Sequence, residues 1–283
     1  MITPEEEKSV AERAYIPEHI LNLMVPISKG EPFLQEDHLI FVKDNWLIFV
    51  GYPLDRHLSQ GRGERVLKQL VDTFRPEYLW FIGPEILPSL SDSCQERETD
   101  RYYTLDVEQA KLKPSLQRIA GKASQQLAIE RSRGFSKEHE TLVAELLKRE
   151  TLPPRVRELY RAMPDYVVRS PSACTLNARD KNGKLCAFFV VELGAKNFST
   201  YVIGCHSKKH YVPHASDLLF FEMINLTREH DKHTIHLGLG VNPGIRRFKE
   251  KWGGTPSLNY EFCERYYGTT RTVALIKSLE GKL

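Results

Sequence analysis

The sequence lacks any apolar run approaching the roughly 18 residues that a helix needs to cross a membrane, so no membrane span is expected. Its first residues, MITPEEEKSV, are acidic and lack the basic start of a secretory signal peptide. The cysteines are few and form no CxxC pair; they are Cys94, Cys174, Cys186, Cys205 and Cys263. An odd number of widely spaced cysteines favours free thiols in a reducing compartment. We therefore expect small buried thiol side chains and a cytoplasmic protein.

A strong excess of charge of one sign is also missing. The chain has 40 Lys and Arg residues against 37 Asp and Glu residues, which gives a net charge of +3. This balance permits contact with phosphate groups, but a dedicated nucleic-acid-binding protein would usually be more basic. The hydrophobic fraction of 41% is ordinary for a globular protein. With 283 residues, the chain can form one large domain or two lobes that each bury a core.

The most regular pattern begins near residue 215 and predicts a helix followed by a strand. Ser216 and Asp217 are polar residues of the type that caps a helix, and an apolar stretch follows them as far as His230. Because this stretch is apolar on most sides, the helix is expected to be covered on both faces. Residues 234–237 are then predicted to form a strand.

A short helix is predicted over residues 243–252. Asn242 followed by Pro243 is a strong start signal, and two glycines at 253 and 254 end the helix. Its buried face is expected to carry Ile245, Phe248 and Trp252.

Residues 172–264 resemble the second half of a GNAT-type acyltransferase domain, in which an Asn-led helix closes with an aromatic residue and glycine. In particular they resemble the tandem-GNAT branch, which includes the Fem peptidoglycan aminoacyltransferases and the cytosolic domain of the phosphatidylglycerol lysyltransferases. The resemblance implies an α+β fold with two GNAT-like lobes. Each lobe is expected to be a mostly antiparallel mixed sheet flanked by helices, with the C-terminal lobe better preserved and catalytic.

We accordingly expect a degenerate N-terminal lobe in residues 1–110, a helical connector in 111–164 and a C-terminal lobe in 165–283. Periodicity and turn signals support this division. In the first lobe they predict strands at 38–43 and 46–52, a helix at 64–74 and a strand at 78–82. In the last lobe they predict strands at 173–178, 185–193 and 198–205.

The segment 204–217 corresponds to the donor-binding loop of acetyl-CoA-dependent GNAT enzymes. In those enzymes a glycine-rich loop offers backbone N–H groups to the pyrophosphate at a helix N-terminus. Here no glycine follows Gly204. A CoA pyrophosphate could still meet the helix N-terminus near Ser216, with Lys208 and Lys209 as counter-charges.

The short helix carries the most specific catalytic candidate, Lys249. Phe248 stands where GNAT enzymes often place a tyrosine acid, and a phenyl ring cannot donate a proton. We group Phe248 and Asn242 with the residues that contact the donor. By resemblance to the Phe-Lys pair of the Fem enzymes, the Lys249 ammonium would stabilise the oxyanion that forms during acyl transfer. The alternative is a surface lysine whose stem covers apolar residues.

Three further residues are candidate bases. The histidines of segment 206–214 recur every four residues, but Pro213 argues against a continuous helix, so we expect one loop base, His206, and no metal site. Asp217 is a second candidate, although it is also a helix cap. Glu192, late in a strand expected to face the cleft, is the third.

These features predict an N-acyltransferase that moves an acyl group from an acyl-CoA, or a similar thioester, to a small-molecule or peptide amine. An aminoacyl-tRNA donor is the alternative within this class, which would make tRNA a partner. A non-catalytic binding protein of the same fold is the competing interpretation, because the glycine cradle and the tyrosine are both missing. No metal or redox cofactor is required, and the sequence does not define the acceptor or the oligomeric state.

Overall fold

The computed structural model describes residues 2–56, 61–108 and 113–268. Its first half begins with three short helices and continues through a meander of strands. The elements are α1 (Pro4–Arg13), η1 (Pro17–His19), α2 (Leu21–Ser28), β1 (Glu31–Gln35), β2 (His38–Lys43), β3 (Trp46–Val50), α3 (Arg62–Phe74), β4 (Tyr78–Gly83), η2 (Pro88–Leu90) and β5 (Glu96–Asp106). The predicted hairpin, helix and strand between residues 38 and 82 are confirmed.

The second half repeats this order with additional elements. They are α4 (Pro114–Ser124), β6 (Leu127–Ser132), α5 (Lys137–Arg149), α6 (Pro154–Arg169), β7 (Ala173–Asp180), β8 (Leu185–Glu192), β9 (Phe198–His206), α7 (Ala215–Glu229), β10 (Thr234–Leu239), α8 (Pro243–Lys251) and β11 (Thr255–Tyr266). Two helices, three strands, a helix and a strand recur in both halves. The expected connector, 111–164, contains one unpredicted strand, β6, at the edge of the sheet. Residues 269–283 of the expected C-terminal lobe lie outside the described residues.

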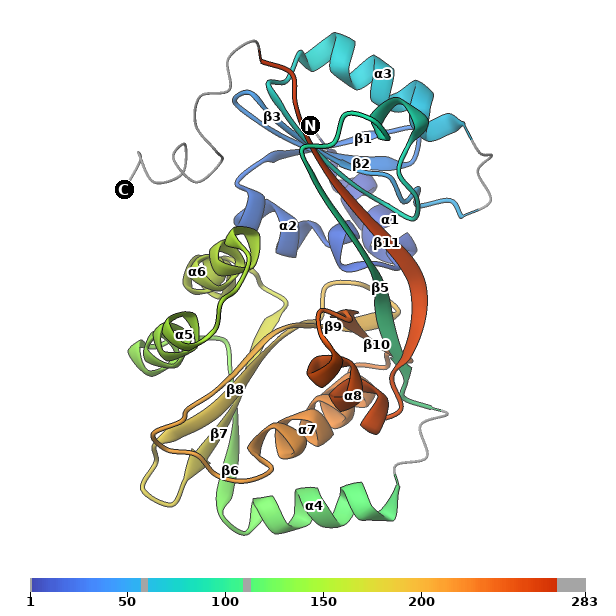
Figure 1. Ribbon diagram of the computed structural model, residues 1–283. Coiled ribbons are helices and arrows are strands. Elements are labelled where there is room, and N and C mark those ends of the chain that lie inside the picture. Colours follow the sequence, from blue (N-terminus) through green and yellow to red (C-terminus); the bar gives the residue numbers. More distant parts are fainter. Residues whose placement is uncertain (1, 57–60, 109–112, 269–283) are drawn as a thin grey trace.

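All the described strands join one 11-stranded mixed sheet, which confirms the α+β fold (Figure 1). The order is β1-β2-β3-β4-β11-β5-β10-β9-β8-β7-β6. Two strands are exchanged between the halves: β11 of the second half inserts between β4 and β5, and β5 of the first half lies between β11 and β10. The long strands β5 and β11 therefore hold the two halves together by backbone hydrogen bonds.

The core has layers on both faces of this sheet. Every residue of β8 is buried, so its alternating side chains enter opposite layers. Phe189 packs with residues of α4 and α7, whereas Phe188 packs with residues of α2, α5 and α6. Smaller clusters under α1 and under α3 complete the first half. Of the described helices, none has both the length and the apolar character needed to span a membrane.

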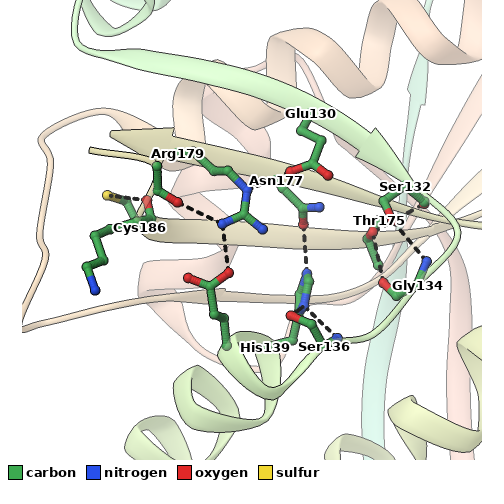
Figure 2. A network of polar contacts seen from close by, with 12 residues as sticks. Glu130, Ser132, Gly134, Ser136, His139, Thr175, Asn177, Arg179 and Cys186 are labelled. Atoms are coloured by element: carbon green, nitrogen blue, oxygen red, sulfur yellow. Dashed lines mark hydrogen bonds and ion pairs between the residues drawn. The ribbon is translucent and has the colours of Figure 1, made fainter. Parts of the chain in front are cut away.

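A paired polar network fixes the start of α5 against the outer strands of the second half (Figure 2). The Ser136 backbone N–H donates to His139 Nδ1 (3.0 Å), so the other ring nitrogen of His139 donates to Asn177 Oδ1 (2.8 Å). Arg179 bridges Glu130 and Glu138 on the neighbouring elements. Because each of these side chains has a partner, this network is explained by folding alone.

The expectation of five free thiols is wrong for two of them. Cys94 and Cys263 form a disulfide with a Cα–Cα distance of 5.4 Å, and Cys174, Cys186 and Cys205 are free. The two bonded cysteines lie 169 residues apart in sequence. They meet only because β11 crosses into the first half, and the cysteine spacing carries no sign of that crossing.

Candidate active site

The parallel pairing of β9 with β10 ends in the middle of the second half. Partners run from Phe198 opposite Thr234 to Thr200 opposite His236, and no later residue of β10 pairs with β9. Immediately beyond Thr200, the β8 and β9 register shifts so that Val202 is an extra residue. Such a bulge bends a strand away from its neighbour. In the first half, by contrast, β3 and β4 pair over all five residues of β3.

A cleft of about 240 Å³ lies at the N-terminus of α7, next to the end of β9. Its lining residues are Cys186, His206, Tyr211, Val212, His214, Ala215, Ser216 and Asp217. The structure thus brings together three predicted site residues, His206, Ser216 and Asp217. Lys208 and Lys209 are exposed and do not line the cleft.

The prediction that Ser216 or Asp217 caps α7 is wrong. The helix begins at Ala215, its N-cap residue is His214 with a left-handed backbone (φ 65°), and no side chain caps it. Asp217 cannot serve as a cap because its carboxylate is engaged elsewhere. One oxygen accepts from Lys251 Nζ (2.5 Å) and from the Trp252 indole (3.0 Å).

The other Asp217 oxygen holds His214, which sequence reasoning did not select. Because Asp217 is an acceptor, His214 Nδ1 donates to it at 3.0 Å, and the opposite ring nitrogen is left as an acceptor. Asp217 is only 6% exposed, whereas the His214 side chain is 48% exposed. The spacing of three residues between these two was the only available signal. A buried carboxylate that orients a half-exposed imidazole is an arrangement found in acid-base catalysis and in ligand binding.

Lys249 lies on α8, two residues before Lys251, and it is buried, with 5% of its surface exposed. Its Nζ donates to the carbonyl of Leu239 at 2.5 Å. Burial lowers the pKa of Lys249 to about 8, although the charge of Asp100 acts in the opposite direction. The predicted burial of Trp252 is confirmed, but Ile245 is 37% exposed. The inward face of α8 is therefore rotated toward Lys249, and a surface lysine is ruled out.

Two other candidate site residues, Glu192 and Asn242, do not line the cleft. Glu192 is buried against α6, where it accepts hydrogen bonds from Tyr166, from Ser170 Oγ (2.9 Å) and from the Gly194 N–H (2.7 Å). It therefore lies in the core and does not line the cleft. Asn242 Oδ1 accepts from the Ile245 N–H (3.0 Å) and caps α8 as predicted.

Phe248 is half-buried and packs edge-on against Phe220, with 5.6 Å between ring centroids. It packs in the cluster under α7, beside the cleft helix. Across residues 2–56, 61–108 and 113–268, no group of three or more His, Cys, Asp or Glu side chains could hold a metal ion.

Comparison with known proteins gives matches by structure only: no family model and no curated protein matches the chain. The C-terminal domain of an Agrobacterium fabrum protein named lysylphosphatidylglycerol synthetase superposes with a TM-score of 0.60 at 15% identity, over 92% of this chain and 90% of that one. FemX superposes with a TM-score of 0.61 at 10% identity, over 92% and 96%. A tandem GNAT protein from the clavulanic acid biosynthesis pathway gives 0.52 at 15%, over 82% and 79%.

At these identities the likeness establishes the fold and leaves the reaction open. The repeated element order, the exchanged strands and the bulged β9 agree with it. The chain has a tandem GNAT-like fold, similar to that of FemX and of the lysylphosphatidylglycerol synthetase domain, as the sequence resemblance predicted.

Proposed function

We propose that the chain is an acyltransferase that moves an acyl group from acyl-CoA, or a similar thioester, to a primary amine. The observation that carries the proposal is Lys249, a lysine 5% exposed that bonds to the end of β10 beyond its pairing with β9. Among the described residues, no carboxylate lies within ion-pair distance of it. A buried ammonium with a lowered pKa costs folding free energy, and such groups concentrate at functional sites.

The cleft at α7 supports donor binding. The first N–H groups of a helix and its dipole attract phosphate. His206 and His214 line the same cleft, and His206 can donate a hydrogen bond to a pyrophosphate. The exposed Lys208 and Lys209 add attraction at longer range.

The chemistry requires few protein groups. The neutral amine attacks the thioester carbonyl carbon, the N–C bond forms and the carbonyl electron pair moves to oxygen. The Lys249 ammonium stabilises this oxyanion. Collapse breaks the C–S bond, the thiolate leaves with the electron pair, and the proton released by the amine passes to a base. Because Phe248 cannot act as an acid, the thiolate takes its proton from another group or from solvent.

An aminoacyl-tRNA donor is the second candidate. It is favoured by the side chains of Tyr211, Val212 and His214, which line the cleft where a glycine cradle would present bare backbone. The structural likeness to FemX and to the lysylphosphatidylglycerol synthetase domain is compatible with it. In either case the donor cleft does not define which amine accepts the acyl group.

Calorimetric titration with acetyl-CoA and with aminoacyl-tRNA tests the two donors. We expect acetyl-CoA to bind and the double variant His206→Ala/His214→Ala to weaken binding about tenfold, the loss of roughly 1.4 kcal/mol in charged or polar contacts. His230→Ala, at the exposed far end of α7, is the matched control and should bind normally.

Other outcomes choose between the alternatives. Binding of aminoacyl-tRNA alone, weakening with added salt as phosphate contacts release counterions, would replace the thioester donor with the second candidate. Binding of neither donor would favour a non-catalytic binding protein.

A further inference from the structure

Four polar side chains meet in the interior where η1 covers the middle of the sheet, and each has a buried polar atom without a hydrogen-bond partner. These atoms are Glu18 Oε2, the Tyr102 hydroxyl, Thr200 Oγ1 and His236 Nε2. We call these four residues the orphan cluster. Tyr102, Thr200 and His236 are each at most 2% exposed. Unmade hydrogen bonds of this kind cost about 1–3 kcal/mol each, so several in one place require an explanation.

The four residues come from four elements but lie together. The Tyr102 and His236 rings meet edge to face, with 4.8 Å between centroids. Thr200 stands opposite His236 at the last paired position of β9 and β10, where the strands separate. Besides burial, the charge of Glu18 and the polar contact between the two side chains raise the pKa of Tyr102, so Glu18 and Tyr102 lie side by side. The orphan cluster thus adjoins the split between the strands.

The free groups of the orphan cluster include both hydrogen-bond acceptors and a donor. His236 Nδ1 accepts from the Gly238 N–H at 3.2 Å, so the ring proton is on Nε2 and points to no partner. The ring is neutral because burial, aided by the charge of Lys249, lowers the pKa of His236 to about 3. The other three residues offer one oxygen atom each. The orphan cluster therefore presents a carboxylate acceptor, two hydroxyl groups that can accept or donate, and one N–H donor.

This pattern fits a primary ammonium group. An ammonium has three N–H donors, which match the oxygens of Glu18, Tyr102 and Thr200. The Glu18 carboxylate supplies the opposite charge, and it would repel an anionic ligand. The N–H of His236 is left for a carbonyl oxygen next to that ammonium. The same chemistry could come from the acceptor amine or from the α-amino group of an aminoacyl donor.

We propose that the orphan cluster binds the primary ammonium group of the substrate, and that Glu18 takes one of its protons. This inference rests on the proposed acyl transfer. The proton moves from the ammonium to the Glu18 carboxylate, which leaves a neutral amine and a neutral carboxylic acid with charge conserved. Burial raises the pKa of Glu18 to about 7, which suits a group that must accept a proton near neutral pH.

The position of Glu18 also suits ligand access. It lies on η1, a three-residue turn between α1 and α2. A cavity of about 30 Å³, large enough for one water molecule, adjoins this turn and is lined by His19, Ile20 and Gly194 among others. None of the four residues of the orphan cluster lines this cavity, so a ligand that enters here reaches them only if η1 shifts.

The test uses the whole chain and three small probes: butylamine, alaninamide and the uncharged propionamide. Binding is followed by calorimetry and by the ¹⁵N resonance of His236 Nε2, a readout that a purely structural role would not change. We expect an amine probe to bind and shift this resonance, and propionamide to leave it unchanged. Binding of both amines would indicate the acceptor amine, whereas binding of alaninamide alone would indicate an aminoacyl group.

The matched variants are Glu18→Gln and Glu12→Gln, the latter on the exposed side of α1. Glu18→Gln should weaken amine binding at least tenfold and leave acetyl-CoA binding unchanged, whereas Glu12→Gln should change neither. Amine binding that survives Glu18→Gln, or no amine binding by a protein that still binds its acyl donor, would overturn this inference alone. Loss of donor binding by the unaltered chain would instead refute the proposed function.

Discussion

Buried ionisable side chains in this chain fall into two kinds. Asp217 is surrounded by partners: Lys251, the Trp252 indole and His214. The Lys249 ammonium bonds to a backbone carbonyl and lies over the Tyr103 ring, 5.8 Å from its centroid, and Glu18 has an oxygen with no partner. Since burying an uncompensated charge costs free energy, only the surroundings of Asp217 are explained by folding. Those of Lys249 and Glu18 fit groups whose partners arrive with a ligand.

The role of Lys249 can be tested with Lys249→Met, which keeps the stem and removes the charge. If the ammonium stabilises an oxyanion, kcat should fall about a hundredfold. Because burial already lowers the pKa of Lys249 from 10.5 to about 8, its charge opposes folding, and the variant should melt no lower than the wild type.

Steady-state kinetics across the pKa of Lys249 complete this test. The wild-type rate should decline as pH rises through about 8 and the ammonium loses its proton, whereas the residual rate of the variant should lack this step. Lys68→Met, on the exposed face of α3, is the control. Equal turnover in the variant and the wild type would remove Lys249 from the mechanism.

The raised pKa of Glu18 predicts an unusual dependence of folding stability on pH. Its pKa is about 7 in the folded chain against 4.5 for the free group, so folding favours the protonated form. The wild type should therefore lose stability relative to Glu18→Gln as pH rises from 4.5 to about 7, by roughly 3 kcal/mol in total, and the difference should stay constant above that. Urea unfolding of both proteins at several pH values measures this, and parallel profiles would show that Glu18 is solvated.

Trp252 is predicted to matter for stability through two separate contacts. Its ring stacks on Phe220 with 5.0 Å between centroids, and its N–H bonds to Asp217. Trp252→Ala should cost about 3–5 kcal/mol, as for other large buried aromatics. Trp252→Phe keeps the stack and loses the hydrogen bond, so it should cost about 1–2 kcal/mol. Equal losses in denaturant unfolding would mean that the hydrogen bond dominates.

At the scale of elements, the sequence was informative wherever local signals decide the structure. Asn242 and Pro243 start α8 as predicted, and the hairpin of β2 and β3 follows from its apolar strands and short turn. The sequence does not predict strand β6 (Leu127–Ser132), because this segment is short, is partly charged and lies between helices. Pairing with β7 makes them a strand, and that pairing is a tertiary contact.

The site was only partly accessible to the same reasoning. Lys249 and the α7 cleft follow from one continuous motif, so they could be selected. The orphan cluster could not, because Glu18, Tyr102, Thr200 and His236 come from η1, β5, β9 and β10. Only the exchange of strands brings β5 beside β10. In sequence, Tyr102 is one aromatic residue among many in a strand.

For the molecule as a whole, the exchanged strands make the two halves interdependent. Strand β11 pairs with β4 from Glu261 to Tyr266 and with β5 along most of its length. A fragment ending before β6 would expose the edges of both β4 and β5 that β11 normally covers, and unpaired edges favour aggregation. The structural boundary between the halves therefore lies within one sheet, and Cys94 and Cys263 fasten it covalently.

The disulfide yields a prediction at this scale. In the chain-entropy model, a crosslink that closes a loop of 169 residues stabilises the fold by up to about 5 kcal/mol, because it restricts the unfolded chain. Cys94→Ser, Cys263→Ser and the double variant should then lose the same stability in denaturant unfolding, since any one of them removes the whole bond. Cys174→Ser, at a free thiol, is the control and should lose little. If the disulfide is absent in the protein as isolated, a reductant will leave the midpoint of unfolding unchanged and the single variants will add independently. That result would restore the interpretation of free thiols drawn from the sequence, and β11 would then be held in the first half by its backbone pairing alone.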